Sequence, residues 1–277
     1  MAYEAQISRN NPTAFLFVVD QSGSMSDKMS SGKTKAEFVA DALNRTLMNL
    51  ITRCSKSEGV RDYFDIGVIG YSGHGVSNGF NGALSNNFLN PISELEKNPT
   101  RVEDRRRKMD DGAGGIIETS VKFPIWFDSV SYGGTPMREA LTTAAEVLVN
   151  WCDSHPECYP PTVLHVTDGE STDGDPEDIA SALKQISTQD GEVLVMNIHV
   201  STLGVDAVRF PSSDTTLPDS YAKMLFRMSS LLPHHLVQFA QGKGHQVNSE
   251  SRGFMFNAEA IEVVDFFDIG TRASQLR

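Results

Sequence analysis

The sequence predicts an α/β protein: a doubly wound, mostly parallel sheet with helices on both faces. One observation is that short apolar runs of strand length alternate with segments whose apolar residues recur at helical spacing. A second is that two of these runs, at residues 15–19 and 162–166, lead into an aspartate. Continuous apolar runs are typical of parallel strands buried on both faces, and ligands bind beyond the carboxyl ends of such strands.

The expected elements follow one another without a long linker. A strand at 15–19 comes first, and a helix follows because apolar residues from Phe38 to Ile51 lie at helical spacing. Thr135 and Pro136 predict a helix start, with an N-cap hydroxyl followed by proline at the first helical position. The other expected elements are strands at 64–70, 162–166, 193–200 and 253–256 and helices opening at 175–178 and covering 219–232 and 258–267.

One stretch departs from this alternation. Residues 74–130 are rich in Gly, Asn, Ser and charged residues and show no helical stripe, so we expect an irregular insertion with short elements near 95–97 and 121–127. The basic and acidic residues of 101–111 are interleaved, which is typical of a solvated face. We expect residues 1–277 to form a single domain that contains this insertion.

Oxygen-bearing side chains gather in three segments that should lie at one edge of the sheet. The first is Asp20-Gln21-Ser22-Gly23-Ser24, directly after the first strand. The second contains Thr135, and the third contains Asp168 after the strand at 162–166. Small oxygen donors on adjoining loops suit a hard cation such as Mg²⁺, which prefers oxygen ligands in octahedral geometry.

These three segments together resemble the metal-ion-dependent adhesion site of the von Willebrand factor A family. The resemblance implies one Mg²⁺ or Mn²⁺ ion, with three hydroxyls as direct ligands and two aspartates acting mostly through water. The matching residues are Asp20, Ser22, Ser24, Thr135 and Asp168. The Gly-Gly-Thr-Pro-Met loop, the Asp-Gly-Glu segment and the ending at 252–258 are similar to the free-standing cytoplasmic bacterial members, including the tellurite-resistance-associated and phosphatase- or kinase-linked groups.

The resemblance implies a metal-dependent protein-binding module in bacterial signalling or stress response. The partner would supply an Asp or Glu carboxylate to the ion, and a protein phosphatase or kinase is the class that the resemblance suggests. The alternative is a regulatory subunit of a metal-dependent phosphatase or hydrolase, or such an enzyme itself. We expect no enzyme, because no residue is placed as a nucleophile or base against the metal.

Three enzyme motifs are each incomplete. The Walker A-like segment at 31–34 has Asp27 where a phosphate-binding loop needs glycine. The segment at 70–74 resembles a nucleophile elbow around Ser72 but has His74 where a small residue is required. The aspartyl-phosphatase pattern at Asp20 has Ser22 in place of the second acid, and serine cannot exchange that proton at neutral pH.

The composition of the chain limits the classes of partner and the compartment that we expect. The chain has 24 Lys and Arg against 36 Asp and Glu, a net charge of −12 that disfavours nucleic-acid binding. No apolar run approaches the roughly 20 residues of a membrane helix, and we expect no signal peptide because the first ten residues are polar. An odd number of cysteines suits reduced thiols, so we expect a cytoplasmic protein. Cys152, His155 and Cys158 are read as free thiols beside a histidine rather than a metal site.

Overall fold

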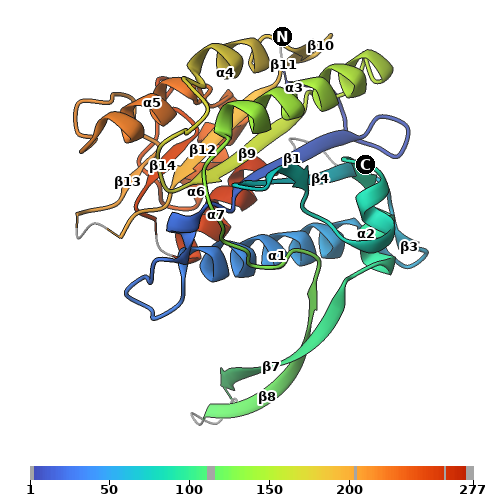
Figure 1. Ribbon diagram of the computed structural model, residues 1–277. Coiled ribbons are helices and arrows are strands. Elements are labelled where there is room, and N and C mark those ends of the chain that lie inside the picture. Colours follow the sequence, from blue (N-terminus) through green and yellow to red (C-terminus); the bar gives the residue numbers. More distant parts are fainter. Residues whose placement is uncertain (1–2, 111–115, 203–204, 259, 273–277) are drawn as a thin grey trace.

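The computed structural model describes residues 3–110, 116–202, 205–258 and 260–272 (Figure 1). Within these residues an eight-stranded sheet lies between two layers of helices, which confirms the expected α/β class. Its strands run in the order β13-β14-β12-β9-β1-β4-β5, with β6 also paired to β4. Strands β14, β12, β9, β1 and β4 are parallel to one another, whereas β5, β6 and β13 are antiparallel to the strands they pair with.

The strands of the sheet are β1 (Thr13–Asp20), β4 (Phe64–Ser72), β5 (Gly75–Asn78), β6 (Asn90–Pro91), β9 (Thr162–Thr167), β12 (Leu194–His199), β13 (Val208–Arg209) and β14 (Phe254–Phe256). Smaller antiparallel pairs are β2 (Ser55–Lys56) with β3 (Gly59–Val60), β7 (Arg101–Asp110) with β8 (Ile116–Ile125), and β10 (Ser187–Thr188) with β11 (Gly191–Glu192).

The α-helices are α1 (Lys35–Cys54), α2 (Ile92–Lys97), α3 (Met137–Ser154), α4 (Glu177–Leu183), α5 (Ser220–Met228), α6 (His234–Gly242) and α7 (Ala260–Gly270). Two short 3₁₀ helices are η1 (Gly23–Ser26) and η2 (Gly82–Asn86). No helix in the described ranges combines the length and the apolar character needed to cross a membrane.

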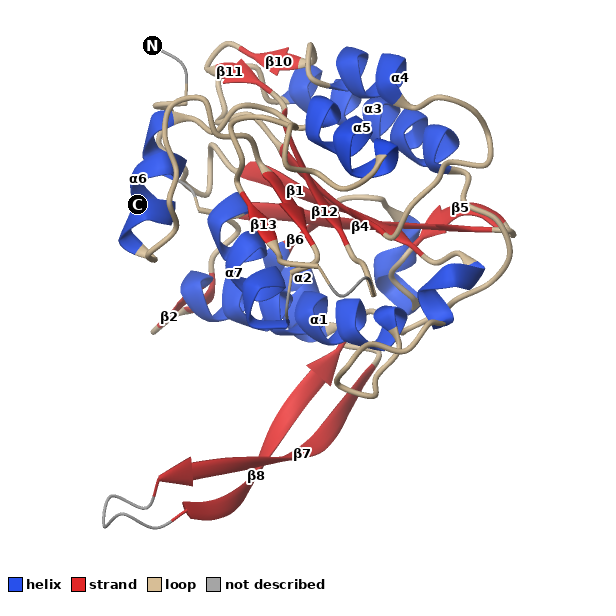
Figure 2. Cartoon of the chain, turned by 90° about the vertical axis from the view of Figure 1, so that its left-hand side faces the viewer, coloured by secondary structure: helices blue, strands red, loops and turns tan. Residues whose placement is uncertain are grey.

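Strand β1 is buried on both faces because its side chains alternate between two cores. Phe15 and Phe17 belong to the core that includes residues of α1 and α7, whereas Leu16 and Val18 belong to the core that includes residues of α3, α4 and α5. Figure 2 shows these two helical layers on opposite sides of the sheet. The unbroken apolar run in the sequence is therefore explained by contacts on both sides.

The order of the strands creates a switch point at the end of β1. The chain passes from β1 to β4 on one side, and the next parallel strand, β9, pairs with the other side of β1. The connections that leave β1 and β9 therefore diverge to opposite faces of the sheet. In open α/β sheets the crevice formed at such a point is where ligands bind.

Two helix starts differ in how they are capped. Helix α1 begins with a capping box, since the Thr34 hydroxyl accepts from the Glu37 amide and the Glu37 carboxylate accepts from the Thr34 amide. The prediction that the Thr135 hydroxyl caps the start of α3 is wrong. That helix begins at Met137 without a side-chain cap of its own, because the carboxylate of Asp173 accepts from the amides of its first turn instead.

Residues 74–130 contain β5, η2, β6, α2 and a long hairpin, β7–β8, that extends away from the sheet (Figures 1 and 2). The short elements expected near 95–97 and 121–127 overlap α2 and the end of β8. The hairpin is paired over its whole length, from Arg101 opposite Ile125 to Asp110 opposite Ile116. A regular ribbon of this length was not expected from the sequence, because its strands do not alternate apolar and polar residues cleanly.

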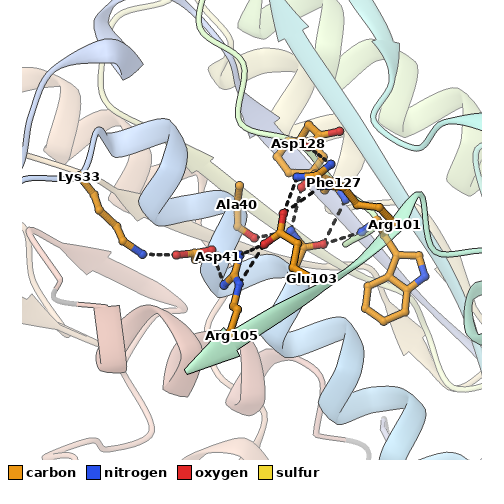
Figure 3. A network of polar contacts seen from close by, with 10 residues as sticks. Lys33, Ala40, Asp41, Arg101, Glu103, Arg105, Phe127 and Asp128 are labelled. Atoms are coloured by element: carbon orange, nitrogen blue, oxygen red, sulfur yellow. Dashed lines mark hydrogen bonds and ion pairs between the residues drawn. The ribbon is translucent and has the colours of Figure 1, made fainter. Parts of the chain in front are cut away.

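The base of the hairpin is connected to α1 by a polar network (Figure 3). Asp41 on α1 forms ion pairs with Lys33 and with Arg105 of β7, at 2.9 Å from the latter. The Arg105 guanidinium also lies 3.9 Å from the centre of the Phe123 ring. Arg101 pairs with Asp128 at 2.6 Å, beyond the end of β8. These contacts fix the direction in which the hairpin leaves the domain.

A buried asparagine on α1 completes this connection. The Asn44 side-chain oxygen accepts from the amides of Trp126 and Phe127, at 2.8 and 3.1 Å. Its side-chain nitrogen donates to the carbonyls of Ala40 and Phe127, both at 2.8 Å. Asn44 is 1% exposed, so water cannot replace these partners when the side chain is removed.

We expect Asn44→Ala to lower the free energy of unfolding by roughly 2–4 kcal/mol, because it leaves several buried backbone groups without partners. Urea denaturation followed by circular dichroism measures this change. The matched control is Asn150→Ala, which removes an exposed helical asparagine that bonds only the carbonyl one turn earlier. Equal stability of the two variants would show that Asn44 does not hold the segment after the hairpin.

Candidate metal centre

Asp20 lies at the carboxyl end of β1 and is 1% exposed. One carboxylate oxygen accepts from the Ser22 amide at 2.8 Å, and the other accepts from the Thr167 hydroxyl at 2.7 Å. Val19 is paired with Val166, so the next residues of β1 and β9 meet at the edge of the sheet. Burial raises the pKa of Asp20 to about 6, against the opposing effect of these hydrogen bonds.

Three further predicted residues form a chain of hydrogen bonds beside Asp20. The hydroxyl oxygens of Ser22 and Ser24 are 3.1 Å apart, and the Ser24 hydroxyl donates to the Asp168 carboxylate at 2.7 Å. Ser22 is the residue before η1, and Ser24 lies within it, so one tight turn places both hydroxyls on the same side. The structure thus brings Asp20, Ser22, Ser24 and Asp168 together, as the sequence predicted.

The loop that carries Thr135 packs directly on the first loop. The Gly23 amide donates to the Gly133 carbonyl at 2.8 Å, and the Tyr132 amide donates to the Gln21 carbonyl at 2.7 Å. Gly73 and Gly133 touch through their backbones: a Cβ on Gly73 would lie 2.8 Å from the Gly133 Cα. Glycine is therefore required at this crossing.

Thr135 itself is buried and held by its backbone. Its amide donates to the Thr172 hydroxyl at 2.9 Å, and its carbonyl accepts from the Thr172 amide at 2.9 Å. These bonds attach the second loop to the segment that follows Asp168. They do not use the Thr135 hydroxyl.

Three residues at this site were missed from the sequence. Thr167 orients Asp20, and His199 lies against the Asp168 carbonyl, 3.0 Å from it through Nε2. Burial lowers the pKa of His199, so the ring is neutral at pH 7. The third is Lys35, whose ammonium lies 2.8 Å from the Asp168 carboxylate. Burial opposes its charge, but hydrogen bonds to Asp168 and Asp27 raise the pKa of Lys35 overall.

A signal for Lys35 was present in the sequence. It is the first residue of α1, where the helix dipole disfavours a positive charge. A lysine directly after a capping threonine therefore implies nearby carboxylates that compensate its charge. Thr167 and His199 carry weaker signals, because a threonine or histidine at a strand end is common.

The residues fit a hard divalent cation. An octahedron with metal–oxygen bonds of about 2.1 Å has neighbouring oxygens about 3 Å apart. The oxygen separations from Ser22 to Ser24 and from Ser24 to Asp168, 3.1 and 2.7 Å, are close to that spacing. In the described part of the chain no three His, Cys, Asp or Glu side chains form a group that could hold a metal ion.

The residues of the incomplete enzyme motifs have other partners. The Ser72 hydroxyl accepts from the His74 amide, and the His74 ring stacks on Tyr132 with ring centres 4.0 Å apart. Lys33 is paired with Asp41. The cysteines at 152 and 158 are buried and free, and His155 stacks on Trp151.

The chain is similar in structure to von Willebrand A domains among proteins of known structure. The SpRpn10 VWA domain aligns with 70% of this chain and 77% of its own, at 12% identity and a TM-score of 0.41. The pilus adhesin SpaC from Lactobacillus rhamnosus GG covers 95% of this chain at 12% identity and a TM-score of 0.47. The type V pili tip protein Mfa5 from Porphyromonas gingivalis covers 58% at 15% identity and a TM-score of 0.34.

This chain spans 30% of the SpaC chain and 20% of the Mfa5 chain. No protein-family model matches the sequence, and no curated protein does. With TM-scores below 0.5, these likenesses carry no argument about function. The case for the site therefore rests on its own geometry.

The raised pKa of Asp20 predicts a pH dependence of stability in EDTA. The carboxyl has an ordinary pKa of 3.8 when unfolded and about 6 when folded, so the folded state holds the proton more tightly. Its contribution is present below pH 3.8 and is lost as the pH rises through 6, by roughly 3 kcal/mol. Urea denaturation of wild type and Asp20→Asn at several pH values measures this. Parallel pH profiles of the two proteins would contradict it.

Proposed function

We propose that the chain is a metal-dependent protein-binding module, in which Mg²⁺ or Mn²⁺ accepts a carboxylate from an Asp or Glu of a partner protein. The proposed ligands are Asp20, Ser22, Ser24, Thr135 and Asp168. The observation that carries this proposal is the hydrogen-bonded chain of oxygens from Ser22 through Ser24 to Asp168, at the switch point of the sheet. Two segments that are far apart in sequence supply these oxygens, and the loop that carries Thr135 packs on the first of them through its backbone.

The side chains have separate roles in this proposal. Both oxygens of Asp20 are already engaged by Ser22 and Thr167, so Asp20 positions the first loop and acts through water. The hydroxyls of Ser22, Ser24 and Thr135 are neutral donors. When bound, the ion supplies positive charge that neutral hydroxyls do not cancel, and this charge attracts an incoming carboxylate.

The surroundings of the site support binding rather than catalysis. The Asp168 carboxylate is engaged by Ser24 and Lys35, and His199 faces a backbone carbonyl. Among the described residues in contact with this cluster, each acid that would act as a base is thus held by a donor. From the sequence resemblance we further propose a cytoplasmic role in bacterial signalling or stress response, with a protein phosphatase or kinase as the partner class.

We expect one Mn²⁺ or Mg²⁺ ion to bind per chain, and Ser24→Ala to weaken binding about tenfold or more, because a donor at the centre of the cluster is lost. Asp20→Ala and Asp168→Ala should abolish binding. Isothermal titration calorimetry measures the affinities. Ser26→Ala is the matched control, because the Ser26 hydroxyl lies in the same turn but donates to the Gly23 carbonyl. Unchanged affinity in all three site variants would place the ion elsewhere.

Capture of a partner from native lysate should require the ion. The net charge of −12 repels acidic partners, but salt screens this repulsion beyond about 10 Å and leaves a direct metal–carboxylate bond intact. We therefore expect EDTA to abolish capture, Thr135→Ala to reduce it, and Thr142→Ala on α3 to leave it unchanged. Equal capture with and without EDTA would refute this prediction. Metal-dependent hydrolysis of phosphomonoesters or esters by the purified chain would favour the enzyme alternative.

A further inference from the structure

Lys35 is a buried cation at the edge of the proposed metal centre. Its side chain is 6% exposed, and its ammonium lies 2.8 Å from Asp168 Oδ2, 3.1 Å from Asp27 Oδ2 and 3.4 Å from the Ser24 carbonyl. The Asp168 side chain is 4% exposed, whereas that of Asp27 is 60% exposed. The principal partner of the buried ammonium is therefore Asp168.

The positive charge of Lys35 is unfavourable at this position unless nearby groups compensate it. A buried ammonium loses hydration, and at the first residue of α1 it also opposes the helix dipole. If Asp168 contacted Lys35 alone, the two residues would form a simple structural ion pair. However, the second oxygen of Asp168 accepts from Ser24, so the same carboxylate joins the ammonium to the hydroxyl chain.

The charges at the centre determine what it attracts. Asp20 and Asp168 together contribute two negative charges when ionised, which a divalent cation balances to zero. The ammonium of Lys35 adds one positive charge that these two carboxylates do not cancel. The Asp27 carboxylate is largely exposed, and water screens its effect. Lys35 would thus make the loaded centre more cationic than the ion and the two carboxylates alone.

We infer that Lys35 is a built-in counter-charge that weakens metal binding while no partner is present and strengthens the hold on a partner's carboxylate. Without the ion, the ammonium neutralises Asp168, so an arriving cation must share that carboxylate. With the ion bound, the ammonium would add positive charge beside it that favours a carboxylate of the partner. Metal and partner binding therefore support each other. This inference rests on the proposed function and names the residue that sets its specificity for acidic groups.

The test compares Mn²⁺ affinity in wild type, Lys35→Gln and two controls by calorimetry. Glutamine can still donate a hydrogen bond to Asp168 but carries no charge, so we expect Mn²⁺ to bind at least tenfold tighter, or about 1.4 kcal/mol. Lys35→Arg keeps the charge and should bind as wild type does. Lys33→Met removes an exposed lysine that faces Asp41 (Figure 3), so it should also leave the affinity unchanged. Lys35→Met replaces the glutamine variant if that protein does not fold.

Acetate provides the second measurement, as a probe for the partner's carboxylate. Acetate binding is measured at saturating Mn²⁺ by water proton relaxation. We expect Lys35→Gln to bind acetate several-fold more weakly than wild type. Opposite changes for the ion and for acetate distinguish a counter-charge from a structural ion pair. If wild type binds Mn²⁺ but Lys35→Gln binds neither probe differently, the inference is wrong and the metal site stands. If neither protein binds Mn²⁺, the proposed function itself fails.

Discussion

The burial of the Asp20 carboxylate is the constraint on which the site depends. It ends the central strand, between β4 and β9, where the chain leaves toward opposite faces of the sheet. One oxygen fixes the first loop through the Ser22 amide, and the other fixes the end of β9 through Thr167. Because Asp168 is the next residue, a single buried acid determines how two loops face each other. Burial raises the pKa of Asp20 despite these hydrogen bonds, because a carboxylate charge is unfavourable where it is removed from water.

The loop that carries Thr135 is positioned by backbone contacts that leave no space for side chains. Gly23 and Gly73 both pack against the backbone of Gly133, at distances that leave no room for a Cβ without a shift. These contacts bring the Thr135 loop close to η1 and the end of β4. Asp173 then caps α3 from the segment after β9, so the second and third loops are joined through the helix that follows Thr135. Backbone and capping hydrogen bonds thus join the three loops to one another.

Much of this arrangement was predictable from the sequence because it follows from local rules. Apolar runs that end in Asp20 and lead to Asp168 imply parallel strands, whose carboxyl ends share one edge, and the intervening serines are small oxygen donors. Contacts between distant segments were not predictable. Asp173 caps α3 although it lies 35 residues beyond Arg138, whose amide donates to it, and Lys35 pairs with an acid on another loop. The register of β7–β8 also depends on pairing that no alternating pattern in its sequence indicates.

Helix α1 contacts both the site and the base of the hairpin. Its buried contacts contribute more to this connection than its exposed ones. At its first turn Lys35 reaches Asp168, and farther along the helix Asp41 and Asn44 hold the base of the hairpin. Exposed ion pairs such as that of Lys33 contribute little to stability, because water and salt screen them. Water does not reach the buried side-chain amide of Asn44, so its hydrogen bonds are not replaced by bonds to water. A partner that contacts both the hairpin and the proposed metal site would therefore be held at a spacing set mainly by Lys35 and Asn44, two buried polar side chains of one helix.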